Sequence, residues 1–166
     1  SVKHVIPCGN GTDALQIAIM SLGLKPSDEI ICPSFTFIAS AEVIGLLGFR
    51  PVFVDVDYDS FNVTAKNIEN AISVKTKAII PVHLFGQAAP MEEILAIAKK
   101  YDFELLMWGD MYFRLCGGGY HHTLPLPEDI GKLVPDNVHI VYWDYYGDEK
   151  ERYLEQIDRH EFIKEN

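Results

Sequence analysis

The chain has 166 residues, of which 48% are hydrophobic and 23% are charged, and its formal net charge is −10. This composition is typical of a globular protein with a buried core and excludes a chain that is disordered throughout. The acidic excess argues against binding to nucleic acid or to an anionic membrane, and no apolar run reaches the roughly 20 residues that span a bilayer.

Short apolar runs alternate along the chain with helical segments. In chain order, the expected strands cover residues 4–8, 29–32, 51–56, 78–84, 105–108 and 138–146. The expected helices cover residues 12–24, 36–47, 64–72, 91–101, 126–134 and 149–164, with Gly48 ending the second and Thr64 capping the third. This alternation predicts a single α/β domain over residues 1–166. The expected fold has three layers, in which helices cover both faces of a mostly parallel, Rossmann-like sheet. The strand interiors EIIC and PVFV are apolar on both faces, so we expect both strands to be covered on both sides.

The three cysteines are Cys8, Cys32 and Cys116, and they are far apart in the sequence. An odd number of isolated cysteines favours free thiols in a reducing compartment, and the first residues do not form a signal peptide, so we expect a cytoplasmic protein. His121 and His122 lie near Cys116, but their spacing does not match that of zinc ligands, so we predict no metal site.

A glycine-bearing turn, GNGTD at residues 9–13, follows the first expected strand and opens the first helix. The amide groups at such a helix start can hold an anion, and the helix dipole favours negative charge there. A phosphate site is one interpretation of this turn. The other is a strand-to-helix connection in which Thr12 or Asp13 caps the helix.

The context of this turn resembles one enzyme family. GNGTDALQIAIMSLGLKPSDEIICPSFTF, its continuation to FNV, and AIIPVHLFGQAAPMEEILAIAKKY resemble the start of the DegT/StrS-type aminotransferases, which use pyridoxal phosphate (PLP) to aminate nucleotide sugars. The resemblance covers residues 1–100. It implies that Gly11 and Thr12 bind the PLP phosphate, that Phe37 stacks on the pyridine ring, and that Asp110 pairs with the ring nitrogen. Residues 83–87 then correspond to the loop before the next helix of the cofactor domain.

The rest of the chain departs from that pattern. The family carries a lysine that forms a Schiff base with PLP, and none of Lys132, Lys150 or Lys164 lies in the expected setting. Without an activating amine, transamination lacks its central step. We therefore assign no catalytic residue, we expect no cofactor although PLP could bind, and we leave enzymatic activity open while leaning against it.

Residues 101–166 resemble a different family. WGDMYFR and VYWDYY are similar to strand ends of the β-N-acetylhexosaminidase barrel of glycoside hydrolase family twenty. By this resemblance Trp108, Asp110, Trp143 and Asp144 would contact a sugar, because barrel sites lie at the carboxyl ends of strands. The Asp-Glu pair that performs cleavage in that family has no counterpart here. The alternative role for the two tryptophans is packing at the strand ends.

Two unlike halves favour an engineered or recombined chimera, expressed recombinantly and without natural catalytic activity. The alternative is a residual PLP- or phosphate-binding module derived from a sugar aminotransferase. An aminotransferase that takes its lysine from another chain and a sugar-binding remnant also stay open. By the aminotransferase topology, the expected strands, numbered along the chain, should lie in the order 3-2-4-5-6-1. We expect no nucleic-acid or membrane partner, and an exposed edge strand could form a homodimer.

Overall fold

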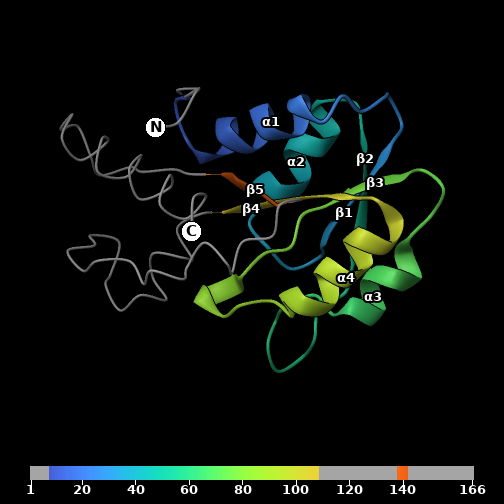
Figure 1. Ribbon diagram of the computed structural model, residues 1–166. Coiled ribbons are helices and arrows are strands. Elements are labelled where there is room, and N and C mark those ends of the chain that lie inside the picture. Colours follow the sequence, from blue (N-terminus) through green and yellow to red (C-terminus); the bar gives the residue numbers. More distant parts are fainter. Residues whose placement is uncertain (1–7, 109–137, 142–166) are drawn as a thin grey trace, which may run out of the picture.

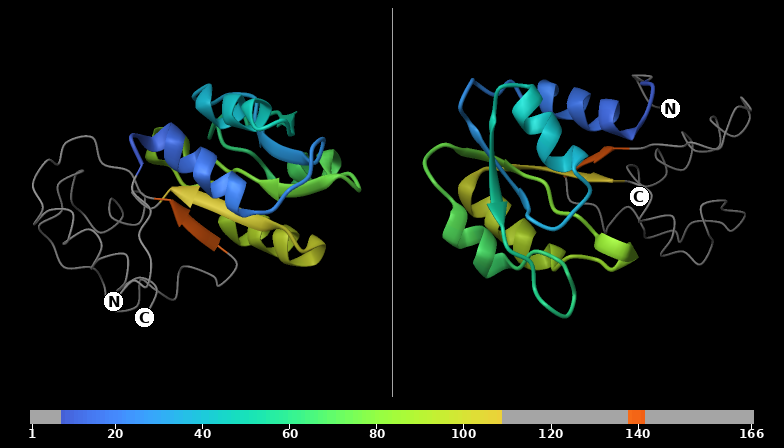
Figure 2. Two further views of the ribbon diagram at one scale, coloured as in Figure 1. Left: turned by 90° about the horizontal axis from the view of Figure 1, so that it is seen from above. Right: turned by 180° about the vertical axis from the view of Figure 1, so that it is seen from behind.

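A parallel sheet forms the centre of the molecule. The computed structural model describes residues 8–108 and 138–141, and Figures 1 and 2 show this part in colour. Its strands lie in the order β2-β1-β3-β4-β5, and every neighbouring pair is parallel. In chain order the strands are β1 Glu29–Pro33, β2 Arg50–Val54, β3 Thr76–Ile79, β4 Glu104–Trp108 and β5 Val138–Val141. The helices are α1 Gly11–Ser21, α2 Ala39–Leu46, α3 Ala65–Ala71 and α4 Met91–Tyr101, with a short 3-10 helix η1 over Leu84–Gly86.

This order confirms the predicted α/β class and the predicted sequence of neighbours. The five strands correspond to the second to sixth expected strands, and they follow the expected order 3-2-4-5-6. The remaining position belongs to the strand expected over residues 4–8, which falls outside the described residues, apart from Cys8. The expected helices over residues 126–134 and 149–164 also fall outside them. The prediction of one domain over the whole chain is not tested by this structure.

Helices cover both faces of the sheet. On one face α1 and α2 pack together, and their apolar side chains surround Ile30, Cys32 and Ile80. On the other face α3 and α4 pack over Ile31 and Ile79. Consecutive residues such as Ile30 and Ile31 enter opposite layers, because side chains of a strand alternate between faces. Burial raises the pKa of the Cys32 thiol to about 12.

Strand β2 differs from the prediction for PVFV. EIIC in β1 is buried throughout, as expected, but Phe53 in β2 is exposed. The expectation that β2 is covered on both sides is wrong for this residue, because β2 is the outermost strand on its side of the described sheet and only β1 pairs with it. An apolar run alone does not distinguish an edge strand from a central one.

The outer side of β2 offers few backbone N–H donors to another strand. Arg50 N–H donates to the carbonyl of Asp28 at 2.9 Å, and Ser34 N–H donates to that of Val54 at 2.8 Å. Arg50 and Val54 therefore face β1, and the alternate residue Pro51 faces outward, where it has no N–H to offer. A homodimer through an exposed edge strand stays a prediction. If it formed at β2, Pro51 would supply no backbone N–H for pairing with the second strand.

Two local sequence signals produce the expected helix ends. The hydroxyl of Thr64 accepts a hydrogen bond from Asn67 N–H at 3.1 Å, which caps α3 as predicted. Gly48 follows α2 with a φ of +80°, a conformation that favours glycine, so the residue type explains why the chain turns there into β2.

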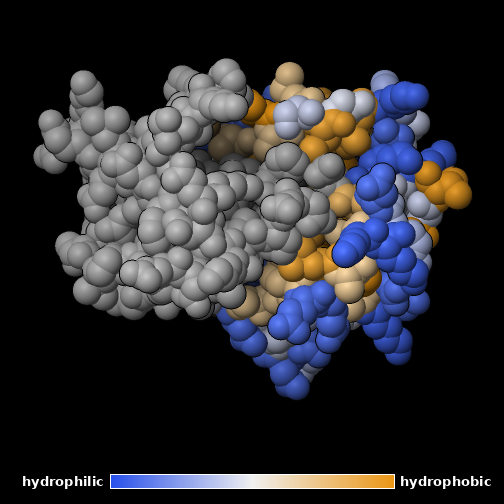
Figure 3. Space-filling model, viewed as in Figure 1, coloured by the Kyte–Doolittle hydropathy of each residue, from blue (hydrophilic) through white to orange (hydrophobic). Residues whose placement is uncertain are grey.

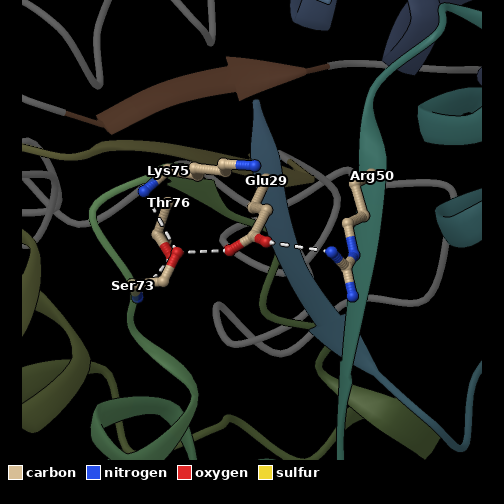
Figure 4. Close-up of polar contacts among 5 residues, drawn as sticks. All are labelled: Glu29, Arg50, Ser73, Lys75 and Thr76. Atoms are coloured by element: carbon tan, nitrogen blue, oxygen red, sulfur yellow. Dashed lines mark hydrogen bonds and ion pairs between the residues drawn. The ribbon is translucent and has the colours of Figure 1, made fainter. Parts of the chain in front are cut away.

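A buried carboxylate links the start of β1 to the start of β2 and to the turn before β3. Glu29 begins β1, and Figure 4 shows its side chain between Ser73 and Arg50. The Ser73 hydroxyl donates to Glu29 Oε2, and Arg50 Nη1 lies 3.7 Å from Glu29 Oε1. Ser73 also accepts from Lys75 N–H at 3.0 Å, and its own N–H donates to Thr76 Oγ1 at 2.9 Å. These contacts fix the turn that leads into β3.

The surface of the described part is mixed. Figure 3 shows hydrophobic side chains reaching the surface beside α1, and a hydrophilic tip where the β2–α3 loop projects. Within residues 8–108 and 138–141, no helix is both long and apolar enough to cross a bilayer.

Candidate functional site

Loops from several parallel strands meet at one edge of the sheet, where the strands end. The loop after β1 carries Phe35, the loop after β2 carries Phe61, and the loop after β3 carries Phe85. The Phe35 and Phe61 ring centroids lie 5.7 Å apart, and those of Phe61 and Phe85 lie 6.2 Å apart in an edge-on arrangement. We call Phe35, Phe61 and Phe85 the aromatic row. In open parallel sheets this edge is the usual place for ligands.

The start of α1 lies at the same end of the sheet. Figures 1 and 2 show α1 beginning at the end toward which the strand arrows point. Its cap is Asn10, whose Oδ1 accepts from Asp13 N–H at 3.0 Å, so the prediction of a Thr12 or Asp13 cap is wrong. Gly11 is buried and Thr12 half-buried in the first turn. Their N–H groups have no acceptor within the helix, and they can serve an anion.

The other predicted site residues are distributed as follows. Phe37 lies between β1 and α2 with 74% of its surface exposed, so its ring can accept a stacked partner. Trp108 is the last residue of β4, at the carboxyl end that the prediction required. Asp110, Trp143 and Asp144, with the three lysines considered above, lie outside the described residues. No group of side chains in the described part could hold a metal ion.

His83 is held as a neutral imidazole in the loop after β3. Its Nδ1 accepts a hydrogen bond from Ala89 N–H at 3.0 Å, so the neutral ring carries its proton on Nε2. Burial lowers the pKa of His83 below its ordinary value of 6.5. The predicted loop over residues 83–87 contains η1 and precedes α4, which agrees with its expected position.

Acid should destabilise the folded chain through His83. Because the folded-state pKa is depressed, the unfolded chain binds the proton more readily, so the stabilisation is complete above pH 6.5 and is lost as the pH falls through the folded-state pKa. Urea titrations should therefore give a lower free energy of unfolding below pH 6.5 than above it. The loss should be smaller in His83→Gln, which keeps a polar side chain that does not titrate. An equal loss in both proteins would contradict this role, since the other five histidines are unchanged.

Asn62 is a site residue that the sequence analysis missed. It is buried, with 2% of its surface exposed, at the end of the loop after β2. Its side chain hydrogen-bonds to backbone groups of Leu84, Gln87 and Ala88, which belong to the loop after β3. These partners are 22 to 26 residues away, so only an aligned set of relatives could have indicated Asn62 from sequence.

Known proteins share this arrangement over most of the described part. Residues 1–110 match the DegT/DnrJ/EryC1/StrS aminotransferase family. The chain is 51% identical over 104 residues to UDP-2-acetamido-2-deoxy-3-oxo-D-glucuronate aminotransferase of Pseudomonas aeruginosa, covering 63% of this chain and 29% of the relative. Thus the chain spans less than a third of the length of this curated relative.

Solved structures give the same result. A DegT/DnrJ/EryC1/StrS aminotransferase from Brucella abortus has a TM-score of 0.60 at 46% identity, covering 66% of this chain and 31% of that one. NtdA from Bacillus subtilis, solved with bound cofactor PMP, has a TM-score of 0.57 at 38% identity, covering 58% of this chain and 22% of that one.

These relationships correct one prediction and leave another untested. An engineered chimera without natural catalytic activity is contradicted, because about half of the aligned residues are identical to those of a named sugar aminotransferase. The family match also continues to residue 110, beyond the junction expected near residue 100. The hexosaminidase resemblance of residues 101–166 is not supported by these relationships and stays a prediction. The chain belongs to the DegT/DnrJ/EryC1/StrS aminotransferase family.

Proposed function

We propose that residues 8–108 form the cofactor-binding part of a PLP-dependent sugar aminotransferase. The observation that carries this proposal is the placement of the first turn of α1 and of the Phe37 loop at the carboxyl edge of one parallel sheet. A phosphate needs donors and positive potential, and a pyridine ring needs an accessible aromatic face. Both requirements can be met at this edge.

The phosphate would be held by the first turn of α1. Gly11 and Thr12 supply two backbone N–H groups that the helix does not use, and the Thr12 hydroxyl adds a third donor. The positive end of the helix dipole favours a bound anion there. Asn10 is already bonded to Asp13 N–H, which keeps the turn in its helical form before a ligand arrives.

The ring would be held by aromatic stacking and by charge. Phe37 offers its exposed face to the pyridine ring, and Asp110 would hold a proton on the ring nitrogen through its carboxylate. When bound, PLP supplies the electron sink that amino-group transfer requires. Trp108, at the end of β4, lies at the edge where a sugar substrate would approach, which suits the predicted contact of Trp108 with sugar.

The substrate class follows from the relatives. The Pseudomonas aeruginosa relative is named for its action on a UDP-linked keto sugar. We propose a nucleotide-linked keto sugar as the amino-group acceptor of the complete enzyme of which this chain represents the cofactor-binding part. The lysine that the reaction requires is not assigned to any residue of this chain.

A titration with PLP tests this proposal. A ligand that binds only the folded state raises its stability, by about 2.7 kcal/mol at a hundred times the Kd. We expect a saturable rise in melting temperature and a saturable change in PLP absorbance. Thr12→Ala and Phe37→Ala should weaken both, and inorganic phosphate should compete with PLP.

Ser21→Ala is the matched control for the phosphate site. Ser21 lies at the other end of α1, where its hydroxyl donates to the Ala18 carbonyl at 2.7 Å, so its loss perturbs the helix without touching the first turn. This variant should bind PLP like the unaltered chain. A cooperative melt that PLP does not shift would refute the proposed function.

A further inference from the structure

The Asn62 side chain connects two loops at the candidate site. Its Nδ2 donates to the carbonyls of Gln87 at 3.0 Å and Ala88 at 3.3 Å. Its Oδ1 accepts from Leu84 N–H at 3.2 Å. Three backbone groups of one loop are therefore satisfied by one buried amide from another loop. Because a buried polar group without a partner is costly, this arrangement specifies one conformation of residues 84–88.

The conformation that Asn62 holds is a strained one. Phe85 has a φ of +56° and a ψ of 17°, in the left-handed region that residues with a side chain normally avoid. Phe85 is also 82% exposed, so burial of its ring cannot offset this strain. Phe61, the neighbour of Asn62 in sequence, has a φ of +56° as well. Strain of this kind persists where surrounding contacts determine it, and it is concentrated at functional sites.

Phe61 and Phe85, which both have positive φ, are two of the three residues that form the aromatic row. Phe61 touches Phe35 on one side and Phe85 on the other. Asn62 thus fixes Phe85 through the backbone of the loop after β3, and it fixes Phe61 through the adjacent peptide bond.

We propose that Asn62 is a positioning residue for the candidate site, which orders the aromatic row as a wall beside the bound cofactor. This inference rests on the proposed function, since it assumes that PLP binds at this edge of the sheet. The wall forms before the ligand arrives, so less conformational entropy is lost on binding. Asn62 itself need not touch the ligand.

The test compares Asn62→Ala with Asn67→Ala in the full chain. Asn67 is a matched control, because its Nδ2 also donates to a loop carbonyl, that of Asp55 at 2.8 Å, and this carbonyl belongs to the loop after β2 and not to residues 84–88. The measurements are the Kd for PLP and amide hydrogen exchange at Leu84 and Ala89. We expect Asn62→Ala to raise the Kd about tenfold and to speed exchange at both amides. Asn67→Ala should change neither quantity.

Phe85→Ala keeps the test decisive if Asn62→Ala does not fold. The exposed ring can be removed with little effect on stability, so this variant should melt like the unaltered chain. It should weaken PLP binding without speeding exchange at Leu84. If both single variants fold, their effects on Kd should not add, because both act through the same wall.

The outcomes separate the two proposals. Unchanged PLP affinity in Asn62→Ala, or in Phe85→Ala, would overturn the positioning role and leave the proposed function intact. An unaltered chain that does not bind PLP would overturn the proposed function, and the positioning role with it. Weaker binding in Asn67→Ala equal to that in Asn62→Ala would show a general loss of stability, and this would also overturn the role.

Discussion

Replacing Ile79 with alanine should lower the free energy of unfolding by about 2–5 kcal/mol. Ile79 is 1% exposed, and it lies in β3 with β1 on one side and β4 on the other. Its register partners, Ile31 and Leu105, belong to the same buried cluster under α3 and α4. Removing three carbons there leaves a cavity that neighbours on both strands cannot fill without shifting the sheet.

The size of this effect is large compared with the total stability of a domain, which is about 5–15 kcal/mol. Urea unfolding followed by circular dichroism would measure it, provided that the transition is cooperative. Val74→Ala is the control, since Val74 is 94% exposed just before β3, and its truncation should change stability by less than about 0.5 kcal/mol. Equal losses in the two variants would contradict the assignment of Ile79 to the core.

Replacing Ser73 with alanine should cost about 1–3 kcal/mol of stability. The Ser73 hydroxyl donates to the buried carboxylate of Glu29 and accepts from Lys75 N–H. Its loss deprives Glu29 of its hydrogen-bond donor in a place where water is largely excluded, and it also leaves the Lys75 amide without this acceptor. Because Glu29 begins β1 and Lys75 lies in the turn before β3, the loss should affect the pairing of both strands.

Arg50→Ala should cost much less, below about 1 kcal/mol. The Arg50 side chain is largely exposed, and its Nη1 lies 3.7 Å from Glu29 Oε1, so solvent screens this ion pair. Denaturant unfolding of both variants at low and high salt would measure the ranking, with salt affecting only the Arg50 contribution. A larger loss for Arg50→Ala than for Ser73→Ala would show that the ion pair is the main partner of Glu29.

The elements that sequence predicts well are those determined by neighbouring residues. The helix Met91–Tyr101 has its predicted bounds, because its apolar residues recur at helical spacing and Asp102 ends it in a left-handed conformation. Thr64 caps α3 for an equally local reason. The exposure of Phe53 does not follow from its apolar run, because it depends on the edge position of β2, which the family topology indicated and the local sequence did not.

The same distinction between local signals and distant contacts applies to the residues of the candidate site. Gly11, Thr12 and Phe37 could be proposed from the family resemblance, since each lies within a short motif. Asn62 and the aromatic row could not be proposed, because they depend on contacts between loops after three different strands. The choice of Asn10 as the α1 cap was missed for a different reason: several adjacent residues can cap a helix, and backbone geometry decides among them.

The buried position of Cys32 determines how the protein withstands oxidants. Only the thiolate reacts quickly with peroxides and disulfides, and a pKa of about 12 leaves almost none of it at neutral pH. Cys8, by contrast, is exposed just before the turn that opens α1. Among the described cysteines, oxidative damage should therefore begin beside the proposed phosphate site, and the centre of the sheet should remain intact while the protein stays folded.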